Sequence, residues 1–222
     1  MRAKESSVRI AVNTMRARLT ALGFNITIIT FQITQLSSER SGPVVPGFDG
    51  TLQTATIALH FALLLSVAAM VALLASSAMS GDGACDSPAF VAGDLLMFLG
   101  LSYTLVAFFQ PLLTELSTRQ LPTPQDTEKF QLLFRTISYM AAVTWALAAY
   151  VGPIVSLLRS PFGKVWNVAL GVSYLLLMVM LAHFIGIAFE LQLRLEHEYV
   201  SQWPVLQLFF LPLEWLIPVT TR

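Results

Sequence analysis

The chain has 222 residues, of which 55% are hydrophobic and 12% are charged. Soluble domains carry about 25% charged residues, so this chain lacks the polar side chains that a water-soluble surface needs. The 13 basic and 13 acidic residues cancel, which gives no support for a nucleic-acid-binding protein, and the single cysteine, Cys85, excludes an internal disulfide framework and a cysteine-based zinc site. We therefore expect an integral membrane protein.

The first expected element is a helix over 7–36 that combines an apolar seam with two polar stripes. The seam follows alternating steps of four and three residues and consists of Val8, Val12, Met15, Leu19, Leu22, Ile26, Ile29, Ile33 and Leu36. One polar stripe follows the same alternation and consists of Asn13, Arg16, Thr20, Gly23, Thr27, Thr30 and Thr34. The other repeats every seven residues, at Arg18, Asn25 and Gln32. Hydroxyl and amide side chains are costly against lipid, so both stripes require water, another helix or a partner.

Four later stretches meet the requirement of roughly 20 apolar residues for crossing a bilayer. They cover residues 52–79, 90–113, 136–158 and 165–189. Gln110-Pro111 and Gly152-Pro153 are expected to kink or end their helices. We expect a single all-α membrane domain over 1–222, in which four transmembrane helices form an up-and-down bundle and the polar N-terminal helix is a candidate fifth membrane segment.

The C-terminal part of the chain is expected to leave the membrane as a helical stalk over 190–200. Glu190 and Arg194, and then Arg194 and Glu198, stand four residues apart and support a helix in water. The partner-binding candidates of this stalk are Glu190, Arg194, His197 and Glu198. Residues 201–222 form an apolar tail with several prolines and tryptophans, as is typical of an interfacial or packed segment.

The distribution of basic residues favours four crossings, with the first helix on or dipping into the cytoplasmic face. In that arrangement every basic residue except Arg159 and Lys164 is cytoplasmic, in agreement with the positive-inside rule. If the polar helix also crosses, the 13 basic residues divide almost evenly between the two sides. We therefore expect both termini to be cytoplasmic, while the crossing of residues 19–36 stays open. The excess of arginine over lysine agrees with a bacterial inner (plasma) membrane.

The polar stripes of the first helix are the first candidate functional feature. Several copies around an axis could turn them toward a central pathway for ions or water, with Arg18 beside Arg16 at the cytoplasmic mouth. The pore-lining candidates are Arg16, Thr20, Asn25, Thr27, Thr30, Gln32 and Thr34. Alternatively, the threonine hydroxyls bond to carbonyls of their own helix and small residues allow close helix packing. We weigh packing or interfacial binding slightly above a pore, because periodicity does not say which face meets water.

Three ionisable residues lie inside the expected spans: His60, Asp94 and His183. The two histidines are expected at similar depth on helices of opposite direction, so haem ligation and a proton relay are hypotheses, while hydrogen bonding to Thr or Ser neighbours is the commoner outcome. Asp94 could attract cations to an entrance or act as an ordinary helix-terminal carboxylate. His183, Glu190 and His197 are too far apart to hold one ion, so no metal site is expected.

Three classes of function follow. The sequence contains no phosphate loop, HExxH motif or nucleophile elbow, so we do not expect an enzyme. The leading hypothesis is a small homo-oligomeric ion channel or pore-forming component surrounded by membrane lipid, because one copy has too few helices to enclose a sizeable aqueous path. The second is a membrane anchor or effector subunit that works with a separately encoded soluble cytoplasmic protein. The third is a haem-carrying electron-transfer subunit.

Overall fold

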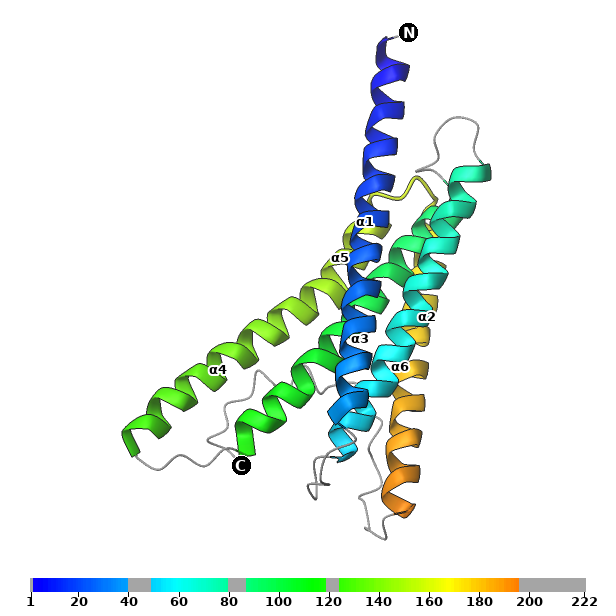
Figure 1. The fold of residues 1–222 in the computed structure, drawn as a ribbon. Coiled ribbons are helices and arrows are strands. Elements are labelled where there is room, and N and C mark those ends of the chain that lie inside the picture. Colours follow the sequence, from blue (N-terminus) through cyan, green and yellow to red (C-terminus); the bar gives the residue numbers. More distant parts are fainter. Residues whose placement is uncertain (1, 40–48, 80–86, 119–123, 196–222) are drawn as a thin grey trace.

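The computed structural model describes residues 2–39, 49–79, 87–118 and 124–195, and every element in these ranges is a helix. The elements are α1 (Arg2–Glu39), α2 (Asp49–Met79), α3 (Pro88–Thr118), α4 (Pro124–Ala146), the π-helix η1 (Leu147–Val151), α5 (Gly152–Leu158) and α6 (Lys164–Leu195). In Figure 1 the axes of α1, α2 and α6 are roughly parallel, with α2 running in the opposite direction to the other two, whereas α4 is inclined away from them and continues through η1 into α5. The all-helical fold class is therefore confirmed for the part of the chain that is described.

Five helical stretches are long and apolar enough to cross a membrane. They are Asn13–Leu36 in α1, Thr54–Ala78 in α2, Pro88–Leu116 in α3, Glu128–Leu158 across α4, η1 and α5, and Lys164–Ile187 in α6. The least apolar of the five is the first, with a mean hydropathy of 1.3 against 2.5 for the stretch in α2. Length and composition thus indicate a membrane location, and they put the polar first helix in the same class as the other four.

Small residues bring α2 and α3 into the closest helix contact of the bundle. A Cβ atom added at Gly93 would lie 2.9 Å from Leu73 Cγ, and one added at Gly100 would lie 3.0 Å from Ser66 Oγ. These two glycines stand seven residues apart on α3, so both face α2. Buried alanines continue the seam on α2, at Ala55, Ala58, Ala62 and Ala69. Between apolar helices, packing of this kind replaces the hydrophobic effect as the source of association.

The helix formed by α4, η1 and α5 is irregular where Gly152-Pro153 interrupts it. In an α-helix the N–H of residue 153 would donate to the carbonyl of Ala149, but proline has no N–H. The Tyr174 hydroxyl of α6 donates to this carbonyl at 2.8 Å, and the N–H of Gly152 donates five residues back to Leu147. The expected disturbance at Gly152-Pro153 is thus a π-turn in which the Ala149 carbonyl accepts a hydrogen bond from a neighbouring helix, whereas Pro111 lies inside α3.

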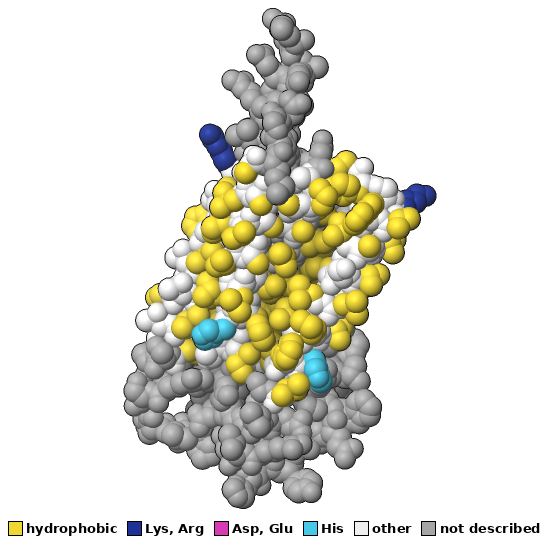
Figure 2. All heavy atoms as spheres, turned by 90° about the vertical axis from the view of Figure 1, so that its right-hand side faces the viewer, with side chains coloured by type: hydrophobic (Ala, Val, Ile, Leu, Met, Phe, Trp, Pro, Cys, Tyr) yellow, Lys and Arg dark blue, Asp and Glu magenta, His cyan; other side chains and the backbone are white. Residues whose placement is uncertain are grey.

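The outer surface of the bundle is apolar over a large part of its length. Figure 2 shows one face on which hydrophobic side chains are nearly continuous and basic side chains stand only at the upper edge. Large exposed hydrophobic residues of α2 and α6 include Leu64, Val67, Val71, Leu175, Leu176 and Val179. Monomeric soluble proteins rarely expose apolar patches of this extent, so the surface is typical of contact with lipid.

Candidate functional site

Arg18 of α1 and Asp94 of α3 form a bidentate ion pair inside the bundle. The Arg18 Nε donates to Oδ1 of Asp94, and Nη2 donates to Oδ2 at 2.6 Å. The Ser156 hydroxyl of α5 donates to the same Oδ2 at 2.9 Å. The Asp94 side chain is 1% exposed, so its negative charge is compensated by these donors rather than by water.

The ion pair fixes one end of α1 on the bundle. Arg18 also lies over the Phe90 ring, with its Cζ 4.8 Å from the ring centroid, in the geometry of a cation–π contact. Arg18 is near the beginning of the apolar stretch of α1, and Asp94 is near the beginning of that of α3. The contact therefore places these two beginnings at the same end of the bundle. Asp94 is paired within the protein and does not face an open entrance.

A second polar contact joins α1 to the seam between α2 and α3. Asn25 Nδ2 donates to Ser66 Oγ at 3.0 Å, and Ser66 in turn lies against Gly100. The Asn25 side chain is 6% exposed, and its Oδ1 has no hydrogen-bond partner among the described residues. Gln32 continues the row one heptad later, and its Oε1 also lacks a partner in the described part of the chain.

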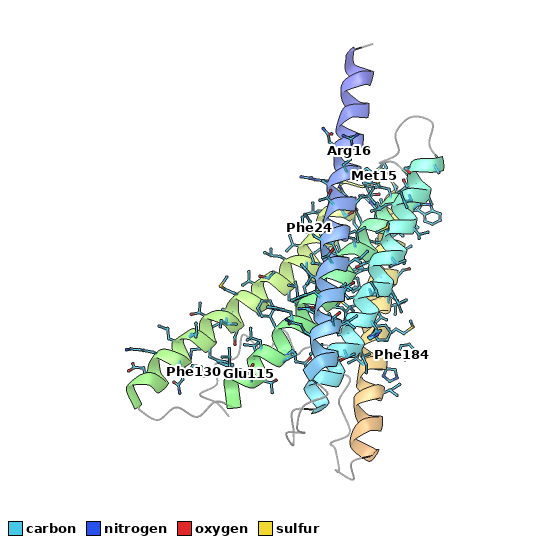
Figure 3. All side chains as sticks on the ribbon, viewed as in Figure 1. Met15, Arg16, Phe24, Glu115, Phe130 and Phe184 are labelled. Atoms are coloured by element: carbon cyan, nitrogen blue, oxygen red, sulfur yellow. The ribbon has the colours of Figure 1, made fainter. Side chains whose placement is uncertain are left out.

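The stripe that alternates by four and three residues lies on the opposite side of α1 and is exposed along its whole length. The exposed residues are Asn13, Arg16, Thr20, Gly23, Thr27, Thr30 and Thr34. Figure 3 shows Arg16 and Phe24 on this helix, with Arg16 nearer the upper end of the bundle. The structure therefore divides the pore-lining candidates into two groups: Asn25 and Gln32 lie on the inner side, and the other five lie on the outer side.

Three threonine hydroxyls of this stripe bond to their own helix. Thr27 donates to the carbonyl of Gly23, Thr30 to that of Ile26, and Thr34 to that of Thr30, each at 2.9 Å. A carbonyl oxygen only accepts, so each hydroxyl hydrogen must point to it, and the oxygens of Thr27 and Thr30 keep lone pairs that can accept on the outer surface. The stripe is therefore less polar toward lipid than its composition indicates, and its remaining capacity is for accepting hydrogen bonds.

The two intramembrane histidine candidates do not share an enclosed space. His60 and His183 are both exposed, and Figure 2 shows two histidine side chains standing apart on one apolar face. His60 Nδ1 donates to the carbonyl of Thr56 at 2.7 Å, within its own helix. Haem ligation between two helices needs both imidazoles to face one cavity, so this arrangement gives the haem hypothesis no support. Among the described residues, no three His, Cys, Asp or Glu side chains lie close enough to hold a metal ion.

A pocket that is partly open to the outside lies where α2, α3, α4 and α6 meet, and the space between atoms amounts to about 480 Å³ only when the open part outside the bundle is counted. Its lining is formed by Thr54, Ala58, Leu99, Ser102, Tyr103, Val106, Trp145, Met178, Ala182 and Ile185. No charged residue and no histidine is among them. The pattern of the sequence alone did not indicate this pocket, because its walls come from four helices and consist mostly of ordinary apolar residues.

The expected C-terminal stalk is described only in part. α6 remains helical to Leu195, beyond Phe189, at which its apolar run ends in the sequence, so the backbone of Glu190 and Arg194 is helical. His197, Glu198 and the apolar tail over 201–222 lie outside the described residues. Comparison with known protein families, curated proteins and solved structures found no match.

Proposed function

We propose that this chain is an integral membrane protein whose first helix crosses the bilayer together with the other four. In the topology with four crossings, α1 lies on the cytoplasmic face while α3 begins on the outer side, which would keep Arg18 away from Asp94. Their ion pair, together with the packing of α1 along α2, supports five crossings instead. The two termini then lie on opposite sides of the membrane.

We further propose that several copies form an ion channel or another pore-forming assembly. The observation that carries this proposal is the exposed polar stripe of α1, in which the hydroxyl oxygens of Thr27 and Thr30 can still accept hydrogen bonds in the middle of a membrane-spanning stretch. A face of this kind is better placed beside water or another copy than beside lipid. The ion pair of Arg18 and the hydrogen bond of Asn25 orient α1 so that the stripe points away from its own bundle.

A symmetric ring of copies would supply the polar pathway for ions or water that one copy lacks. The pocket described within a single bundle is apolar, so it offers no lining for ions or water. Beside the polar stripe, Phe24, Ile28 and Phe31 form an exposed apolar ridge on α1, with Phe24 68% exposed. In a ring of copies the stripe would face the axis and the ridge would contact a neighbouring helix.

The test of this proposal is ion flux in vesicles that contain the purified protein with Cys85 replaced by serine. Cysteine is introduced at Thr27 or Thr30, and a charged methanethiosulfonate reagent is added. We expect the reagent to block flux severalfold at these positions and to leave it unchanged in a Val67→Cys control, because Val67 is exposed on α2, away from the stripe. Absence of flux under all conditions, or equal sensitivity of the control, would rule out a pathway along α1.

One observation favours the anchor or effector subunit as a second candidate. α1 begins at Arg2, and Figure 1 shows its N-terminal part projecting beyond the bundle. α6 likewise continues past its apolar stretch to Leu195. With five crossings the two extensions lie on opposite sides of the membrane, so each is a surface on which a soluble protein could dock from its own side. Copurification of such a protein, lost on replacing Glu190 and Arg194 by alanine but not on replacing Thr27, would favour this candidate over the channel.

A further inference from the structure

The pocket between α2, α3, α4 and α6 starts at one boundary of the apolar stretches and runs toward their middle. Thr54 lies five residues after Asp49, the first residue of α2, and Ile185 lies five residues before the charged Glu190 of α6. Met178 lines the same pocket seven residues earlier on α6, so the pocket follows the helix axis for about 10 Å at 1.5 Å per residue. This end of the bundle is opposite the ion pair of Arg18 and Asp94.

The polar atoms of the lining have little to offer a polar ligand. The Ser102 hydroxyl donates to the carbonyl of Phe98 at 2.8 Å, and the Tyr103 hydroxyl donates to that of Met178 at 3.1 Å. Their hydrogens are therefore committed within the protein. Since the lining carries no charge, a charged or strongly hydrated ligand would lose its water without compensation. The chemistry of the walls fits a neutral hydrocarbon.

We propose that this pocket holds the acyl chain of a membrane lipid. Apolar cavities of this kind do not fill with water, and leaving one empty forfeits packing contacts. In a bilayer the surrounding solvent is itself hydrocarbon, and the pocket is partly open to the outside, with a lining that begins near the ends of the apolar segments of α2 and α6. A lipid whose headgroup stays at this boundary can place one chain along the pocket axis. The inference rests on the membrane location proposed above but does not depend on the pore.

Trp145 provides a direct probe, because it lines the pocket and is only 5% exposed. The other tryptophans, Trp166, Trp203 and Trp215, are replaced by phenylalanine, and the protein is reconstituted in phosphatidylcholine with brominated or ordinary acyl chains. Bromine quenches indole fluorescence only near contact. The reference is a single-tryptophan protein in which Trp145 is also replaced and Leu176→Trp supplies an indole on the exposed face of α6.

If an acyl chain occupies the pocket, Trp145 is quenched about as strongly as the tryptophan at position 176. Ala58→Leu or Ala182→Leu fills the pocket from α2 or from α6 and should at least halve the quenching of Trp145, while the same changes leave the reference unaffected. The added leucine side chains project into the pocket from different helices. One variant is therefore enough for the test if the other does not fold.

Quenching of Trp145 that is severalfold weaker than that of the reference would overturn the proposal, even if neither variant folds. So would strong quenching that persists in a folded pocket variant, because the bromine would then reach Trp145 by another route. Ion flux does not enter this measurement. A protein in which Trp145 is not quenched can still conduct ions. A protein that conducts no ions can still show quenching of Trp145. The lipid proposal and the pore proposal can therefore fail separately.

Discussion

Arg18 on α1 and Asp94 on α3 are 76 positions apart in sequence, yet the guanidinium of the first meets both carboxylate oxygens of the second. The carboxylate is 1% exposed and the arginine 25% exposed. The pair also recruits the Ser156 hydroxyl, so it joins α1, α3 and α5 at one point. It is the contact on which the placement of the polar first helix depends.

Replacing Arg18 should therefore lower the unfolding free energy by more than the partial exposure of its side chain suggests. Arg18→Met leaves the Asp94 charge buried without a cation, and we expect a loss of about 3 to 5 kcal/mol in unfolding free energy. The double variant Arg18→Met, Asp94→Leu should recover most of this loss. Denaturant unfolding in detergent measures both. Arg16→Met is the control, because Arg16 is exposed on the same helix; an equal loss there would show that the pair contributes nothing specific.

The proposed crossing of α1 predicts opposite accessibility for its two ends. In a chain with Cys85→Ser, a membrane-impermeant thiol reagent should label Ser7→Cys from one side and Ser37→Cys only from the other. Ser160→Cys, in the turn between α5 and α6, should react from the same side as Ser7→Cys. If Ser7→Cys and Ser37→Cys react from one side together, α1 does not cross and the pore proposal along it fails.

The seam between α2 and α3 should not tolerate even one additional methyl group at Gly100. The new Cβ would lie 3.0 Å from Ser66 Oγ and 3.3 Å from the carbonyl oxygen of Ala62, so we expect Gly100→Ala to destabilise the protein by about 1 to 3 kcal/mol. At Gly23 a Cβ meets no atom within 4 Å. Because alanine favours a helix over glycine by up to about 1 kcal/mol, Gly23→Ala should be neutral or stabilising. Thermal unfolding of the two variants side by side decides whether the close approach is real.

Tyr174 should contribute to the stability of the fold through its contact with the π-turn next to Pro153 on another helix. Its hydroxyl donates to the carbonyl of Ala149, which lies in the π-turn immediately before Pro153, a residue with no N–H to donate. Tyr174→Phe abandons a buried acceptor, so we expect a loss of about 1 to 3 kcal/mol in unfolding free energy. The exposed Tyr139 serves as the control, and Tyr139→Phe should stay within about 0.5 kcal/mol of the parent. If both changes have the same effect, the hydroxyl of Tyr174 does not compensate for the proline.

The two exposed histidines should be dispensable for folding. His60→Leu and His183→Leu replace polar groups on an apolar face, and we expect unfolding free energies within about 0.5 kcal/mol of the parent, or slightly higher. The purified parent should show no haem absorption in the visible region. A haem band that disappears in either variant would contradict this expectation and would require His60 and His183 to meet between copies.

The helical class and the five apolar stretches could be predicted from the sequence because both follow from local patterns, namely runs of apolar residues and turn residues between them. The same was true of the disturbance at Gly152-Pro153, since a proline acts on its own helix. The heptad spacing of Arg18, Asn25 and Gln32 correctly grouped residues that share one face of α1. Periodicity could not say that this face is the inner one, because orientation depends on what the neighbouring helices present.

Only the tertiary structure determined which residues the buried polar side chains contact. Asp94 requires a cation wherever it is buried, but several arginines could have supplied it, and folding selected Arg18. Ser66 could equally have bonded within α2; the space beside Gly100 lets Asn25 reach it. The apolar pocket arises from the spacing of four helices and leaves no mark in any one of them. Local composition thus determined which segments are helices suited to a membrane, whereas burial and contacts between distant residues determined which way the polar side chains of α1 face.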